Sequence, residues 1–189
     1  EVLQQQAAEM ARKYQIPVTV RNFRETDKPS TYVGSHSVTA SGDRVTAVVD
    51  QPELLVFDLD TREQRLALQI AERLARRRLT FFQVNTKAAQ TRFAVRPLKY
   101  RDVERMVREV IESRGVEARL NTGDFALVSI VGEPLRRRLD AWDEQAERVL
   151  VDAGIELHGS SRDDISLSYL VSEGDRKKAV ECLHRQLVL

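Results

Sequence analysis

The chain has 189 residues, of which 42% are hydrophobic and 31% are charged, as is usual for a globular protein. Its 30 basic and 29 acidic residues leave a net charge of +1, which argues against a nucleic-acid-binding protein, because such a protein needs a basic excess on one face. The single cysteine, Cys182, excludes an intramolecular disulfide and a cysteine-based zinc site.

Targeting and membrane signals are not visible in the sequence. No apolar stretch approaches the ~18 residues that a membrane-spanning helix needs, and the first residues do not have the pattern of a signal peptide. We therefore expect a cytoplasmic protein without a membrane partner. Because the sequence does not begin with Met, we also expect it to be part of a longer chain.

Residues 1–43 predict a helix, a strand and a connection. Apolar residues recur at helical spacing in residues 1–15, and residues 16–23, IPVTVRNF, have the composition of a strand. The rest of this part is rich in Pro, Ser, Gly and Asp and has no periodicity, so we expect it to connect two domains. A short strand is predicted next at residues 45–50, and Pro52 follows it closely.

From residue 53 the pattern predicts the order βαββαβ. Strands are predicted at residues 53–60, 79–86, 90–95 and 116–121, and helices at 61–78 and 100–114. The first of these helices has Thr61 as its expected N-cap and Glu63 in its first turn.

The same order begins again at residue 125 but lacks its last strand. Strands are predicted at residues 125–132, 155–161 and 164–171, with a helix through residues 139–149 and a closing helix. Since the strand at 45–50 has no helix of its own, strand counting predicts that it completes the second sheet. The expected fold class is α+β, with two ferredoxin-like units of which the first is inserted into the second. The expected domains are residues 1–43, residues 52–121, and residues 44–51 together with 122–189.

No motif predicts catalysis or metal binding. The eight glycines lack the spacing of a phosphate-binding loop, and the three histidines are far apart. Asp163 and Asp164 fall in a predicted turn, which Asp favours through its own backbone hydrogen bonds. The arginine runs at residues 76–78 and 136–138 lie beside acidic helix positions and are expected to be solvated faces. Trp142 and Cys182 lie on apolar helix stripes and are expected to pack.

Several stretches resemble aspartate kinases. The segment VLQQQAAEMARKYQIPVTVRNF, followed by PSTYVG, is similar to the end of their kinase domain, although Gln4 and Gln5 stand where that family has His-Pro. The stretches FALVSIVG, GIELHGSS, DISLSYLV and AVECLH resemble the second of the two ACT domains in the family's regulatory region. LLVFDLD through RFAV resembles the first. In that family, too, the first ACT domain is inserted after the initial strand of the second.

The resemblance implies the regulatory, amino-acid-sensing and dimerising segment of an aspartate kinase, in feedback control of lysine, threonine and methionine biosynthesis. The parent enzyme would use ATP and Mg to phosphorylate the aspartate carboxylate, with its substrate sites upstream. This segment would have no catalytic residue and no cofactor of its own. Because ACT domains pair side by side, we expect a homodimer through the first unit, and we expect no nucleic-acid partner.

The resemblance also places a candidate effector site between the loop at residues 60–64 and the strand at residues 80–86, at the interface between two first ACT units. The candidate residues are Asp60, Thr61, Gln64, Thr80, Phe81, Phe82, Asn85 and Thr86. Helix N–H groups would hold the carboxylate of an amino acid, while main-chain carbonyls and Asn85 would hold its amine. Phe82 stands where lysine-sensitive members tend to place an acid, so lysine, threonine or no effector all stay open.

Two alternatives of a different class remain. One is a non-enzymatic ACT pair with a structural or interaction role. The other is a ferredoxin-like nucleic-acid binder, which would need the aromatic rings of Phe81, Phe82 and Phe93 exposed on the sheet for stacking bases.

Overall fold

The computed structural model forms two compact units, Glu1–Gly42 and Asp43–Leu189. In the first unit, β1 (Val18–Val20) pairs antiparallel with β2 (Thr31–Val33). The strand expected within residues 16–23 is thus present, while the helix expected in residues 1–15 is described at residues 10–11 alone. The structure describes residues 10–11, 14–22, 24, 30–33, 44–59, 64–77, 79, 81–85, 91–96, 103–115 and 118–188.

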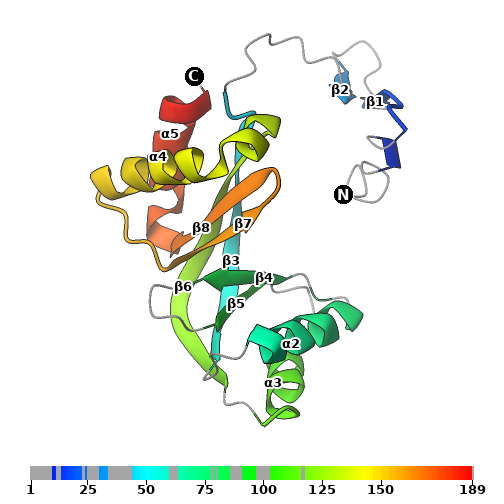
Figure 1. Cartoon of the computed structure of the whole chain (residues 1–189), viewed down its shortest axis with the longest axis vertical. Helices are drawn as coiled ribbons and strands as arrows, with labels where there is room; N and C mark the ends of the chain where they lie inside the picture. The colour runs from blue at the N-terminus through cyan, green and yellow to red at the C-terminus, as the bar shows by residue number, and fades with distance from the viewer. Residues whose placement is uncertain are drawn as a thin grey trace. The chain divides into compact units, whose positions relative to one another are not determined.

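Two long strands run through the second unit. β3 (Ala47–Leu59) and β6 (Ala118–Val131) pair antiparallel, with Ala47 opposite Val131 at one end and Leu59 opposite Ala118 at the other. Figure 1 shows the two strands side by side over their length. The prediction of separate strands was wrong here, because the segments 45–50 and 53–60 join in β3 and the segments 116–121 and 125–132 join in β6.

An irregularity in β3 explains why Pro52 does not end the strand. The register shifts between Gln51 and Leu54, and Glu53 adopts a positive φ of 57°. The N–H of Glu53 donates to Oε2 of Glu173 at 3.2 Å, so it is paired although it lies outside the ladder. A bulge of this kind re-aims a strand without terminating it, and a proline is tolerated there because no ladder bond needs its missing N–H.

Each end of the β3–β6 ladder carries its own hairpin and helices. We call the end with strand order β4-β5-β3-β6 the first module, and the end with order β3-β6-β8-β7 the second module. In the second module, residues 47–51 of β3 pair with residues 127–131 of β6, so the early strand lies where strand counting places it. The first module contains α2 (Gln64–Arg76), β4 (Phe81–Asn85), β5 (Thr91–Val95) and α3 (Val103–Glu112). The second contains η1 (Glu133–Arg137), α4 (Leu139–Asp152), β7 (Gly159–Asp163), β8 (Ser166–Ser172), η2 (Glu173–Asp175), α5 (Arg176–Leu183) and the π-helical η3 (His184–Val188).

Three apolar clusters hold these layers together. In the first module, Ala67, Ile70 and Leu74 of α2 recur at helical spacing and are fully buried against α3 and the sheet. In the second, the helices α4 and α5 cover β6 and β8, with Trp142 and Cys182 partly buried against this core as the sequence predicts. The third cluster draws on strands of both modules and therefore joins them. Its buried members are Leu54, Val56, Val84, Ala94, Phe125, Leu127 and Leu170. No helix of the described residues is long and apolar enough to cross a membrane.

Among the described residues, the hairpins of the two modules are joined by one register pair. Asn85 of β4 lies opposite Ser160 of β7, which closes the strand order β3-β5-β4-β7-β8-β6 into a ring. Gly159 permits this approach, because a Cβ there would lie 2.5 Å from Cγ1 of Val84 and 2.7 Å from the carbonyl oxygen of Asn85. Its φ of 151° is also one that other residues rarely adopt. The strand was predicted at residues 155–161, but in the structure it begins at Gly159 and ends at Asp163.

We predict that Gly159→Ala destabilises the protein by about 1–3 kcal/mol, because the added methyl group overpacks the contact between β4 and β7. Urea unfolding measures the effect. Gly174→Ala is the matched control, since a Cβ at Gly174 meets nothing within 4 Å. Equal unfolding free energies for the two variants would contradict the assignment of Gly159 to the closure.

Candidate functional site

The eight residues of the predicted effector site are described in part. Phe81, Phe82 and Asn85 belong to β4, and Gln64 is the first residue of α2, without a described side chain. β4 is therefore the side of the predicted site that the structure describes. The other four lie outside the described residues: Asp60, Thr61, Thr80 and Thr86.

The two aromatic residues of β4 pack toward opposite faces of the sheet, as neighbours on a strand do. The ring of Phe81 meets the edge of Phe93 at 5.7 Å between centroids and packs on the core of the first module. Phe82 packs against the cluster that joins the modules. An acid in place of Phe82 would face apolar side chains there, which accounts for a phenyl ring at this position. Phe93 is fully buried and the other two rings are half-buried, so the three rings are not exposed together on the sheet as a base-stacking surface would need.

Asn85 lies at the end of β4, exposed, and next to the second module of its own chain. Its register partner is Ser160, and its carbonyl group is the one that Gly159 approaches. The described neighbours of this candidate residue therefore include the GIELHGSS segment, which the sequence assigns to the other unit. A ligand bound at Asn85 would lie at the closure of the ring.

A charged pair reinforces the same junction. Asp58 of β3 and Arg92 of β5 are register partners, and they form a two-pronged contact with Nε–Oδ1 at 2.5 Å and Nη2–Oδ2 at 3.0 Å. The remaining Nη1 donates to the carbonyl oxygen of His158 at 2.8 Å. Only 14% of the Arg92 side chain and 24% of the Asp58 side chain are exposed, so screening by water is limited. Arg92 thereby ties the first module to the segment that precedes β7.

His158 is held in place on its other sides as well. Its ring meets the edge of Phe125 at 5.1 Å between centroids, and its Nε2 lies 3.2 Å from Oγ of Ser172. Its backbone N–H donates to the carbonyl oxygen of Leu170 at 2.9 Å. The junction is thus a fixed polar contact between modules. Among the described residues, no cluster of three metal-ligating side chains is found.

Sequence patterns did not identify the residues that join the modules, namely Asp58, Arg92, His158 and Gly159. A weak signal existed, because Asp58 and Arg92 interrupt two apolar strands with opposite charges. Their pairing, however, depends on the register between β3 and β5, which the sequence alone does not give.

A second polar network lies within the second module. The hydroxyl of Tyr169 donates to Oδ1 of buried Asp143 at 2.7 Å, and Arg162 of β7 forms ion pairs with Asp143 and, at 3.0 Å, with Asp140. Burial, together with the hydrogen bond to Asp143, raises the pKa of Tyr169 well above its usual value. The network connects α4 with β7 and β8 and satisfies a carboxylate that would otherwise be buried without partners.

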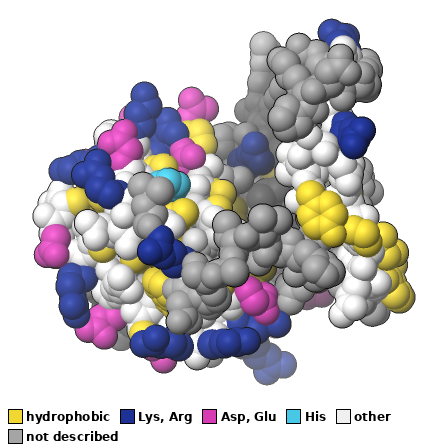
Figure 2. Space-filling view, turned by 90° about the horizontal axis from the view of Figure 1, so that it is seen from above, with side chains coloured by type: hydrophobic (Ala, Val, Ile, Leu, Met, Phe, Trp, Pro, Cys, Tyr) yellow, Lys and Arg dark blue, Asp and Glu magenta, His cyan; other side chains and the backbone are white. Residues whose placement is uncertain are grey.

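Arg76 and Arg136, one from each arginine run, lie on solvated faces. Arg76 pairs with Glu72 at 2.8 Å, and Arg136 pairs with Glu133 at 3.4 Å and with Asp164 at 3.5 Å. All of these side chains are largely exposed, and Figure 2 shows acidic and basic side chains interspersed over one face of the molecule. Asp164 is in the predicted turn, where its N–H donates to Oδ1 of Asp163 at 2.8 Å.

We predict that Arg92→Leu costs about 2 kcal/mol of unfolding free energy, because it leaves the Asp58 carboxylate and the His158 carbonyl without their donor. Urea unfolding of Arg92→Leu, Asp58→Asn and the double variant gives the coupling between the two side chains. Arg148→Leu is the control, since Arg148 is exposed and pairs only along its own helix with Glu144, at 2.7 Å. A loss no larger than that of the control would contradict a role for Arg92 at the junction.

The raised pKa of Tyr169 predicts a pH dependence of stability. The folded state keeps the phenol protonated above the pKa of the unfolded chain, which is about 10. The stabilisation is therefore fully present below that pH and is lost as the pH rises above it, by up to about 1.4 kcal/mol per pH unit. Urea unfolding from pH 9 upward should show this loss, and Tyr169→Phe should reduce it. The same slope in both proteins would contradict the prediction.

The comparisons with known proteins give a clear result for structure and none for sequence. No family model matches the sequence, and the curated proteins contain no match. The regulatory subunit of aspartate kinase from Thermus thermophilus, in a ligand-free form, matches with a TM-score of 0.61 and 20% identity over 77% of this chain and 99% of that chain.

Two longer enzymes match over nearly all of this chain. The aspartate kinase of Clostridium acetobutylicum has a TM-score of 0.68 and 16% identity, over 97% of this chain and 44% of its own. E. coli aspartokinase III, in a complex with lysine and aspartate, has a TM-score of 0.71 and 18% identity, over 100% of this chain and 43% of its own. The chain therefore has the α+β fold of the regulatory region of aspartate kinases.

Proposed function

We propose that this chain is the amino-acid-sensing regulatory region of an aspartate kinase, with two ACT domains. The first domain comprises residues 52–121, and the second comprises residues 44–51 together with 122–189. The observation that supports this most directly is the divided β3 strand, whose residues 47–51 complete one sheet while residues 54–59 belong to the other. Aspartate kinases share this fold, and the match to E. coli aspartokinase III extends over the whole chain.

The parent enzyme would phosphorylate aspartate with ATP and Mg²⁺ at sites outside these residues, and the region would adjust that activity in response to lysine or threonine. This is feedback control of lysine, threonine and methionine biosynthesis. Coupling between the modules would travel through β3 and β6, because each strand is a single element of both sheets. A shift of one module therefore displaces strand ends in the other. By itself, the region would transfer no phosphate.

The assembly that fits this function is a homodimer through the first module. Within the described residues, Asn85 is the only member of β4 that pairs with β7, so the earlier part of this strand has a free edge on that side. A free edge in a sheet favours pairing with a second chain. A second copy at this edge would bring its own residues close to the candidate site.

Lysine is the effector that we place first, because E. coli aspartokinase III has been observed in a complex with lysine. Phe82 offers no countercharge for a lysine ammonium group, and this favours a pose in which the lysine side chain extends toward water. The same feature supports the alternative function, an ACT pair that binds no amino acid and serves as a structural or interaction module.

Calorimetry with lysine and with threonine tests the proposal. We expect saturable binding of one of them, weakened about tenfold by Asn85→Ala through loss of a hydrogen bond to a charged group. Gln186→Ala, which removes an exposed amide on η3, should leave the affinity unchanged.

Sedimentation of the same samples should give about twice the 21.6 kDa of one chain. Absence of binding by either amino acid would contradict amino-acid sensing and favour the structural alternative. Binding that Asn85→Ala does not change would show that the effector site lies elsewhere.

A further inference from the structure

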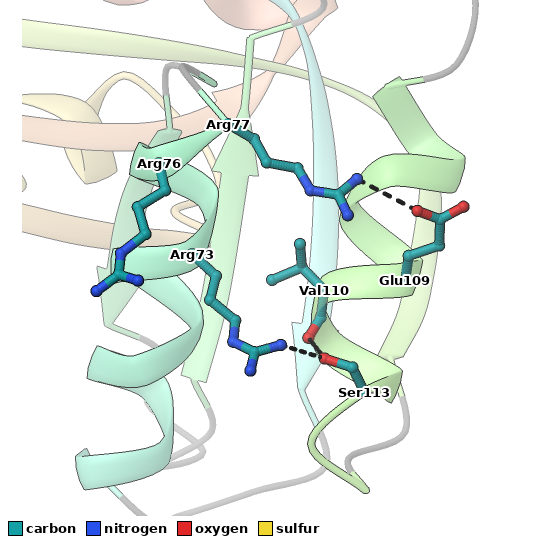
Figure 3. Close-up of a pocket in the computed structure, with 6 residues that line it drawn as sticks. All are labelled: Arg73, Arg76, Arg77, Glu109, Val110 and Ser113. Atoms are coloured by element: carbon teal, nitrogen blue, oxygen red, sulfur yellow. Dashed lines mark hydrogen bonds and ion pairs between the residues drawn. The ribbon is translucent and has the colours of Figure 1, made fainter.

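A cavity of about 320 Å³ lies between the ends of α2 and α3, on the helical side of the first module. Among the candidate effector residues that the structure describes, none lines it. Figure 3 shows Arg73 and Arg77 extending from the α2 side across the gap toward α3, while Arg76 points away from α3. The lining residues are Arg73, Arg76, Arg77, Glu109, Val110 and Ser113.

Arg73 is held by a neutral partner. Its Nη1 donates to Oγ of Ser113 at 2.8 Å, and that hydroxyl in turn donates to the carbonyl oxygen of Val110 at 2.8 Å. Within the described part of the chain, no carboxylate pairs with Arg73. A guanidinium group has five N–H donors, and among the described residues the structure shows a side-chain partner for one of those on Arg73.

Arg77 is held weakly. Its Nη1 donates one hydrogen bond to Oε2 of Glu109 at 3.2 Å. The exposed fraction is 44% for the Arg77 side chain and 51% for the Glu109 side chain. Exposed pairs of this kind are readily exchanged for a better partner. Among the described residues, three arginines and one glutamate line the groove, and Arg76 pairs with Glu72 on α2. The described lining therefore has an excess of positive charge.

The dipole of α2 explains why arginines lie at the end of this helix, but it does not explain the direction of their side chains. Basic side chains are favourable in the last turn of any helix, because they face the negative end of the helix dipole. That effect does not require two guanidinium groups to point across a groove toward a second helix. Both of these arginines line the same cavity.

We propose that this groove binds the phosphate group of a small molecule, between the guanidinium groups of Arg73 and Arg77. A phosphate dianion has several strong acceptor oxygens, which match the forked donors of two arginines, whereas a carboxylate offers one charge and two oxygens. Ser113 would hold Arg73 in place through its hydroxyl group. The cavity volume is at the small end of ligand sites and suits a compact phosphate ester. The described residues of this site differ from those of the candidate amino-acid site at β4.

Titration of the 189-residue chain with inorganic phosphate, at constant ionic strength and followed by NMR of the arginine side chains, tests the proposal. We expect saturable shifts of the Arg73 and Arg77 signals. Arg73→Gln and Arg77→Gln should each weaken binding about tenfold. Arg148→Gln is the matched control, because Arg148 is exposed on α4 and pairs with Glu144 at 2.7 Å. Acetate should not displace phosphate.

Glu109→Gln separates a ligand site from a purely structural bridge. It removes the carboxylate that competes for Arg77 and repels the dianion, so phosphate should bind more tightly to this variant. If Arg73 and Arg77 only bridge the helices, Glu109→Gln lowers the thermal stability and leaves the response to phosphate unchanged. That result would overturn the proposal. The absence of saturable shifts in the unmodified chain, or equal affinity in the Arg73→Gln and Arg148→Gln variants, would also overturn it.

Discussion

The antiparallel ladder between β3 and β6 is the constraint on which the rest of this structure depends. Each of these strands supplies backbone hydrogen bonds to both sheets, so neither module has a complete sheet without the other. The bulge at Gln51–Leu54 makes this sharing possible, because it redirects β3 without ending it. The apolar cluster around Val56, Leu127 and Leu170 then buries the faces on which the modules meet.

The two hairpins also contact each other directly. In the described part of the chain this contact includes one register pair, one glycine and the charged pair that reaches the carbonyl of His158. In the proposed function, a ligand that changes this closure would change how the two hairpins lie on the ladder that they share. Asn85 belongs both to the closure and to the candidate effector site, and it is where the two roles meet.

Much of the fold follows from local patterns. The helical spacing of Ala67, Ile70 and Leu74 defines the buried face of α2, and strand counting places residues 47–51 in the second sheet. The continuity of β3 through Pro52 did not follow, because a proline signals a strand end unless a bulge accommodates it. The contacts that join the modules, and the groove that Arg73 and Arg77 line, did not follow from local patterns either. Both depend on register and helix packing between residues distant in sequence, such as Asp58 with Arg92.

The divided use of β3 has a consequence for the order in which the chain is made. On a ribosome, residues 47–51 are synthesised long before their partners at residues 127–131, and the whole first module is synthesised between them. The backbone N–H and C=O groups of the early strand therefore have no strand partner from residues 127–131 while the first module is being synthesised. Val48 belongs to the apolar face of that strand, and Asp50 and Pro52 follow it. A nascent chain with a charge and a proline at this point is better protected against pairing with a neighbouring chain than an uninterrupted apolar strand would be.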